Sequence, residues 1–248
     1  MSATPPLEPL EPLWLLAWRV VDGQHMVSTR KLVDSDDEQE LLDAMLDAAG
    51  PPSAPDVHGL HPLLARPLRL PPLPYGSRFG SRHERGIWYG ALEPRTAFAE
   101  AAFYRLLFFS DTEARLDPMM LDLLLFSVPV TTRHGVDLTK APFDAVSEVV
   151  TSRTSYVETQ RLGSAMRESD VEAFLYPSAR DPEGGTNVGV FSPRAFAAKR
   201  PASPAPWVCH VGRDAVELSD RGIFERRRIR FPRQLFETGG ELILPASA

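Results

Sequence analysis

The fold class is decided by residues 86–100, Gly-Ile-Trp-Tyr-Gly-Ala-Leu-Glu-Pro-Arg-Thr-Ala-Phe-Ala-Glu. Ile87–Tyr89 predicts a short strand, because β-branched and aromatic residues favour strands and glycines flank this segment. Pro94 suits the first turn of a helix, where its missing N–H costs nothing, and the apolar pattern continues that helix to about Phe109. A strand followed at once by a helix predicts an α/β or α+β fold.

The rest of the chain agrees with this class and predicts short mixed sheets flanked by helices. The segment from Leu116 to residue 126 fits a helix or a strand equally well, and a Pro-rich turn is expected at Pro201–Pro206. Helices are predicted at 34–50 and Tyr156–Glu168, and strands at Leu13–Val21 (buried), Val27–Val33, Phe126–Val130, Phe174–Tyr176, Val188–Phe191, Trp207–Val211, Arg228–Phe231 and Glu241–Leu244.

The 248 residues predict one compact domain, 1–248. The stretch Pro51–Pro74 holds 8 prolines in 24 residues, which is too many for regular structure. We expect it to be an ordered surface loop rather than a linker, because neither flank offers enough apolar sequence for a core of its own.

Composition narrows the class of protein. A net charge of -6 and a pI near 5.6 argue against direct nucleic-acid binding. A lone cysteine, Cys209, forms neither an internal disulfide nor a cysteine zinc site, which favours a reducing compartment. No stretch approaches the ~20 apolar residues that span a bilayer. We therefore expect a cytoplasmic protein with no membrane association.

Glu100 is the most informative residue of the predicted helix. It is the only charge between Ala97 and Tyr104, and helical spacing surrounds it with Ala97, Phe103, Tyr104 and Leu107. A carboxylate in such a place needs a partner or has a raised pKa, which is typical of functional sites. The alternative is a helix whose Glu100 face meets water.

The loop Gly76–Gly86 carries three arginines and three glycines in eleven residues. Glycines let backbone amides approach an anion, and arginine forks match phosphate oxygens. A solvated basic loop is the alternative, because the pattern is neither a Walker loop nor a dinucleotide-binding fingerprint. Tyr89, at a strand end beside glycine, suits stacking on a flat heterocycle or a place in the core.

Other candidate motifs are weaker. Ser178 lies in a turn after a strand but not in a Gly-x-Ser-x-Gly elbow, so serine-hydrolase chemistry lacks support. His58 and His61 have no third ligand in register, and we expect no metal. The basic run Arg226–Arg230 is either a docking surface or a solvated edge strand.

The segments Gly-Ser-Arg-Phe-Gly, Gly-Ile-Trp-Tyr-Gly-Ala and Pro-Arg-Thr-Ala-Phe-Ala-Glu together resemble the RES domain family, whose members are toxins of bacterial toxin–antitoxin pairs. The resemblance covers about Leu15 to Phe196. It places the family's Arg, Tyr, Glu and Ser on Arg78, Tyr89, Glu100 and Ser178. Two further positions that it matches are Asn187 and, in the segment Trp-Arg-Val, Arg19.

The resemblance implies a fold similar to that of ADP-ribosyltransferases, with NAD as substrate and no cofactor. Arg78 and Arg19 would clamp the pyrophosphate, and Tyr89 would stack on the nicotinamide. Glu100 would stabilise the positive charge that develops on the ribose as the nicotinamide bond breaks. Ser178 would orient Glu100 or the nicotinamide amide, and Asn187 would bind substrate.

The resemblance also implies partners and leaves alternatives open. The acceptor of the ADP-ribosyl group is water, inorganic phosphate or a protein, so NAD degradation and protein ADP-ribosylation are both candidate activities. A catalytically inactive scaffold is a third. A helix-turn-helix antitoxin of the Xre type is the expected partner, and a homodimer is a further expectation. The 34–74 insertion and the C-terminal extension 201–248 depart from compact family members.

Overall fold

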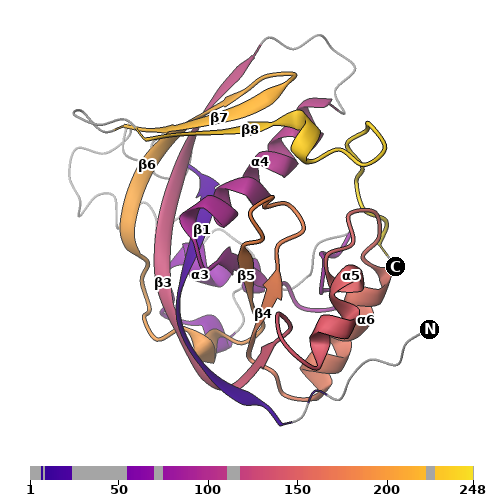
Figure 1. Ribbon diagram of the computed structural model, residues 1–248. Coiled ribbons are helices and arrows are strands. Elements are labelled where there is room, and N and C mark those ends of the chain that lie inside the picture. The colour runs from indigo at the N-terminus through magenta and orange to yellow at the C-terminus, as the bar shows by residue number, and fades with distance from the viewer. Residues whose placement is uncertain are drawn as a thin grey trace, which may run out of the picture.

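Strand β3 (Met119–Asp137) is the spine of the molecule. The computed structural model describes residues 7, 9–23, 55–69, 75–110, 118–221 and 227–247, and Figure 1 shows β3 running along the length of that part. It pairs in antiparallel fashion with β1 (Glu11–Asp22) and β6 (Ala202–Val211) and in parallel with β4 (Ala173–Pro177). The strand predicted at 126–130 is the middle of this 19-residue strand.

The strands of the described part form one mixed eight-stranded sheet in the order β1-β2-β5-β4-β3-β6-β7-β8. The remaining members are β2 (Trp88–Ala91), β5 (Thr186–Val190), β7 (Ala215–Asp220) and β8 (Arg228–Pro232). Because β1 also pairs with β3, the strands β1, β2, β5, β4 and β3 form a closed ring of pairings. The α+β class is confirmed. Where several short sheets were expected, the described strands form a single large sheet.

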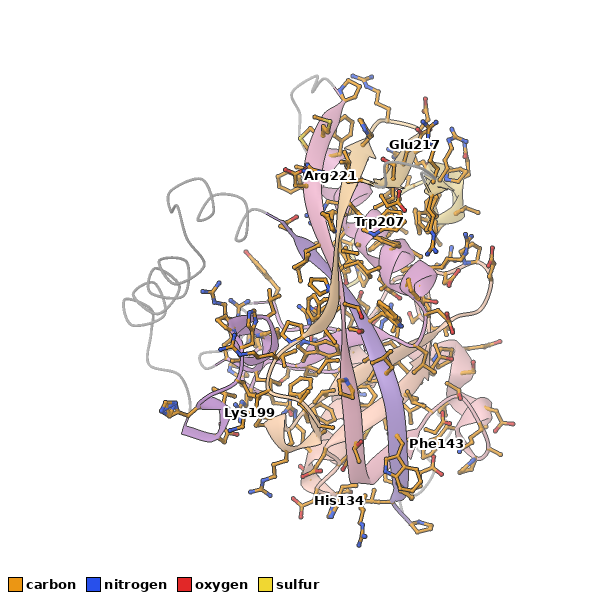
Figure 2. The ribbon with its side chains drawn as sticks, turned by 90° about the vertical axis from the view of Figure 1, so that its left-hand side faces the viewer. His134, Phe143, Lys199, Trp207, Glu217 and Arg221 are labelled. Carbon is orange, nitrogen blue, oxygen red and sulfur yellow. The ribbon has the colours of Figure 1, made fainter. Side chains whose placement is uncertain are left out.

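Figure 2 shows the two ends of this sheet, with His134 of β3 at one end and Glu217 of β7 and Arg221 at the other. β1 is a strand as predicted, but it is not buried throughout. Leu13 and Ala17 lie in the core, whereas Trp14 and Leu16 are exposed, because successive strand residues point to opposite faces.

Helix α4 (Pro94–Ser110) packs against β1 and β2 and against β6 to β8 (Figure 1). Its buried aromatic side chains join those of the sheet, and the rings of Phe98 and Trp207 lie 4.5 Å apart. Each such ring contributes about 1.5–3 kcal/mol by burial. The helices predicted at 94–109 and 156–168 are confirmed by α4 and α6 (Val157–Glu168).

Shorter helical segments complete the described part, and α5 and α6 lie beside β4 (Figure 1). They are α3 (Pro62–Ala65), α5 (Ser147–Val150), and the 3-10 turns η1 (Pro55–Val57), η2 (Arg66–Leu68), η3 (Phe143–Val146), η4 (Pro193–Ala195) and η5 (Arg233–Leu235). No helix in the described ranges is long and apolar enough to cross a bilayer.

The Pro-rich stretch is more regular than predicted over its described part, residues 55–69. Prolines occupy first-turn positions of α3 and η2, where a missing N–H is harmless. Leu64 and Leu68 are buried beside Trp88, whose Nε1 donates to the carbonyl of Leu63 at 3.3 Å. Residues 51–54 and 70–74, like the strand and helix predicted at 27–33 and 34–50, lie outside the described residues.

The C-terminal part also differs from expectation. The predicted turn at 201–206 is instead the first half of β6, which pairs there with β3 alone and reaches β7 only from Trp207. Within the described residues, Pro204 and Pro206 thus lie where β6 has a partner strand on one side only, which is where a strand tolerates proline. β7 was not predicted, and the strand predicted at 241–244 is only a bridge between Thr238 and Glu241.

Candidate functional site

A cavity of about 840 Å³ opens between α4, the loop at 75–86, β2 and the C-terminal residues. Arg19, Arg78, Tyr89, Glu100 and Asn187, all singled out by the sequence, line it. Ser178 does not line it and lies behind Glu100. The cavity wall carries more arginine than carboxylate, which suits an anionic ligand. Its charged lining residues are Arg19, Arg69, Arg78, Arg82, Arg85, Glu84 and Glu100.

Glu100 has the hydrogen-bond partners that a carboxylate among apolar side chains requires. Its Oε1 accepts a hydrogen bond from Ser178 Oγ at 2.7 Å and another from Asn187 Nδ2 at 2.6 Å. Because an ionised carboxylate only accepts, the amide of Asn187 must turn its nitrogen to Glu100. Both donors bind the same oxygen, so Oε2 has no hydrogen-bond partner among the described residues and remains available to a ligand in the cavity.

A tight turn after β4 fixes the hydroxyl of Ser178. Its Oγ accepts from the backbone N–H of Arg180 at 3.2 Å and of Asp181 at 3.0 Å, so its proton is directed to Glu100. Asp181 in turn accepts from Thr96 Oγ1 at 2.7 Å, which ties the turn to the first turn of α4. A Cβ on Gly185 would stand 2.0 Å from Thr96 Oγ1, so only glycine permits this approach.

Arg78 projects from a closed turn of the glycine-rich loop. Gly76 has a φ of +66°, and Ser77 N donates to the carbonyl of Gly80 at 2.7 Å. Arg78 Nη1 donates to the carbonyls of Val150 at 3.0 Å and Ser152 at 2.8 Å. These bonds fix the guanidinium while the side chain still lines the cavity.

Arg78 stays charged although its side chain is buried. Desolvation lowers the pKa of Arg78, but the nearby Tyr156 and Glu100 outweigh it, so the pKa lies above its ordinary value. The guanidinium carbon stands 4.6 Å from the centre of the Tyr156 ring, a cation–π arrangement. Arg78 is thus a permanent cation beside Glu100.

Tyr89 anchors the loop that carries Arg78. Its hydroxyl lies 3.0 Å from Ser77 Oγ and accepts from the backbone N–H of Phe79 at 3.1 Å. Burial raises the pKa of Tyr89 to about 12, so the phenol is neutral at physiological pH. Its ring lines the cavity, and stacking on a heterocycle stays a prediction.

Arg19 reaches the cavity from β1. Its Nη1 donates to the carbonyl of Tyr89 at 2.9 Å, and its guanidinium carbon lies 5.3 Å from the centre of the Trp88 ring. Burial lowers the pKa of Arg19 to about 10, so the side chain keeps its charge at neutral pH. The structure therefore brings Arg19, Arg78 and Glu100 to one cavity from three distant segments.

Sequence reasoning missed most of the aromatic lining. All five tyrosines of the chain line this cavity, and the hydroxyls of Tyr104 and Tyr156 lie 3.2 Å apart. The one available signal was the spacing of Tyr104, one helical turn after Glu100. Leu244, Pro245 and Ser247 of the C-terminus also line the cavity, and no local pattern indicated this.

Residues of the weaker motifs have structural contacts and do not form a second site within the described residues. His61 caps α3, its Nδ1 accepting from Leu63 N at 3.2 Å, and no cluster of three potential metal ligands occurs within the described residues. Arg230 of the edge strand β8 pairs with Glu217 at 3.2 Å. Cys209 is buried, and burial raises the pKa of its thiol to about 11, which leaves it unreactive.

The fold and the site define an α+β protein with an arginine- and tyrosine-lined cavity in which two hydrogen bonds fix the carboxylate of Glu100. The chain belongs to the RES domain family, whose model matches residues 53–210. That region includes Arg78, Tyr89, Glu100, Ser178 and Asn187 but neither Arg19 nor the C-terminal lining residues. The family is known from toxin–antitoxin systems, which supports a toxin-like role and an NAD-related enzymatic role in general. Comparison with curated proteins gives no significant match.

Proposed function

We propose that this protein cleaves the nicotinamide–ribose bond of NAD and so acts as the toxin of a toxin–antitoxin pair. The observation that carries the proposal is the setting of Glu100. One carboxylate oxygen is fixed by Ser178 and Asn187, and the side chain lines the same cavity as Arg78 and Arg19. A fixed carboxylate in one cavity with two cations is the arrangement that a cationic sugar intermediate with a pyrophosphate requires.

The dimensions and charges of the cavity fit a dinucleotide. Its volume of about 840 Å³ lies within the range of small-molecule sites. Arg78 and Arg19 offer guanidinium groups to the pyrophosphate, and the tyrosine walls offer aromatic faces to the two bases. Family membership adds the NAD-related chemistry.

The bond breaks with its electron pair leaving on the nicotinamide nitrogen, which becomes neutral, and positive charge develops on the ribose carbon. Glu100 stabilises that charge, while its unpartnered Oε2 accepts a hydrogen bond from a ribose hydroxyl. Ser178 and Asn187 are positioning residues, because their bonds to Oε1 keep the carboxylate from rotating. Water or phosphate then attacks the ribose carbon.

The test is incubation of the purified chain with NAD, in buffer with and without phosphate, and identification of the products. Release of nicotinamide with ADP-ribose indicates hydrolysis, and ADP-ribose 1″-phosphate indicates phosphorolysis. A mass increase on a partner protein indicates ADP-ribosyl transfer instead. If NAD remains intact under all these conditions, the proposal is wrong. Co-expression with a helix-turn-helix antitoxin tests the partner.

A further inference from the structure

The C-terminal strap, residues 244–247, lies against the segment Thr154–Tyr156. Ala246 N donates to the carbonyl of Thr154 at 2.9 Å, and Tyr156 N donates to the carbonyl of Ala246 at 2.7 Å. The two segments form a parallel bridge between Ser155 and Ala246. Pro245 is buried, so the contact is more than a surface crossing.

Residues 150–156, which include the segment that receives the strap, also hold Arg78. Nη1 of Arg78 bonds the carbonyls of Val150 and Ser152, and its guanidinium faces the ring of Tyr156. Tyr156 also meets Tyr104 through their hydroxyls. A continuous chain of contacts therefore runs from Ala246 through Tyr156 to Arg78.

The strap is itself part of the cavity wall, through Leu244, Pro245 and Ser247. It lies outside the region that matches the family, which ends at residue 210. We propose that the C-terminal strap is a substrate-binding element of this chain, which positions Tyr156 and Arg78 and closes one side of the cavity.

This inference rests on the proposed function and predicts that the strap affects substrate binding but not bond cleavage. Glu100 is held by Ser178 and Asn187, on the turn after β4 and on β5, and neither residue contacts the strap through a hydrogen bond. Losing the strap therefore weakens the hold on the pyrophosphate while the bond-breaking machinery stays in place. The expected effect is on KM and not on kcat.

The test is a chain ending at Ile243, which keeps the partly buried Leu242 in its cluster. We expect its KM for NAD to rise about tenfold, with kcat within twofold of the full chain. Ala246→Pro removes the N–H that bonds the carbonyl of Thr154, and we expect KM to rise about threefold. Glu241→Ala is the control, because that side chain is exposed and does not line the cavity.

A second measurement needs no substrate and separates the strap from the proposed function. Phenylglyoxal modifies accessible arginines, and Arg78 is only 8% exposed in the full chain. Mass spectrometry should find Arg78 modified several-fold faster in the truncated chain and at an unchanged rate in Glu241→Ala. Unchanged modification of Arg78 after truncation, or an unchanged KM in an active truncated chain, overturns the inference. Intact NAD with faster modification of Arg78 refutes the proposed function but retains the positioning role.

Discussion

Replacement of Glu100 by Gln is the most direct perturbation of the site. Gln keeps the shape of the side chain, and its amide oxygen can take the place of Oε1 and accept from both Ser178 and Asn187. The amide nitrogen then replaces the free Oε2, so one negative charge and one acceptor are lost from the cavity. The substitution separates the charge of Glu100 from its role as a hydrogen-bond acceptor.

The magnitude follows from the contact that is lost. Removing one electrostatic contact that acts on transition-state charge costs about 3 kcal/mol, or ~10²-fold in turnover. Two hydrogen bonds to a charged acceptor become bonds to a neutral one, which lowers the free energy of unfolding by about 1 kcal/mol. The protein should therefore remain folded while the rate falls.

The assay is single-turnover release of nicotinamide, measured with NAD affinity and with thermal unfolding. Glu217→Gln is the matched control, because Glu217 is an exposed residue of β7 (Figure 2) and forms an ion pair with Arg230. We expect Glu100→Gln to lose rate with little change in affinity, and the control to lose neither. Near-normal cleavage by a folded Glu100→Gln protein would refute the assignment of the catalytic charge to Glu100.

Three further substitutions test the rest of the site. Arg78→Ala should raise the Kd for NAD about tenfold or more with a smaller effect on the rate, because a pyrophosphate is held similarly before and during bond cleavage. Isothermal titration calorimetry measures the Kd, and a loss confined to turnover would contradict this prediction. Ser178→Ala removes one donor to Glu100 and leaves the N–H groups of Arg180 and Asp181 without their acceptor. Turnover should fall about tenfold, and denaturant titration should show a free energy of unfolding lower by about 1–3 kcal/mol; unchanged turnover would refute the positioning role. Tyr89→Phe deletes the acceptor for Phe79 N and the bond to Ser77. We expect denaturant titration to show a free energy of unfolding lower by about 1–3 kcal/mol, and calorimetry to show a higher Kd for NAD. Unchanged stability would show that this hydroxyl does not anchor the loop.

Local interactions explain what could be predicted from the sequence. Pro94 and the apolar spacing that follows it predict α4, because helical hydrogen bonds join residues four apart. The same spacing surrounds Glu100 with apolar neighbours and so indicates an unusual carboxylate before any partner is known. The family resemblance, not spacing, suggested that Ser178 orients Glu100, and it assigned Asn187 to substrate binding; only the structure shows that Asn187 also bonds Glu100.

Elements that depend on distant strands were harder to predict. The apolar run at 119–130 fits a helix or a strand, and only pairing with β1 and β6 makes it the long strand β3. The prolines near residue 204 predicted a turn, but β6 tolerates them because β7 begins to pair only at Trp207. In both cases the neighbouring strand decides the structure.

The sequence by itself determined the α+β class and the helix that carries Glu100, and with the family resemblance it indicated five residues of the cavity wall, namely Arg19, Arg78, Tyr89, Glu100 and Asn187. Only the tertiary structure decided how Glu100 is held, that Tyr89 anchors the loop of Arg78, and that every tyrosine and the C-terminal strap meet at one cavity. The physical reason is that these contacts join residues between ten and about ninety positions apart along the chain. Such contacts are set by the closure of the sheet around β3, and no pattern of neighbouring residues encodes them.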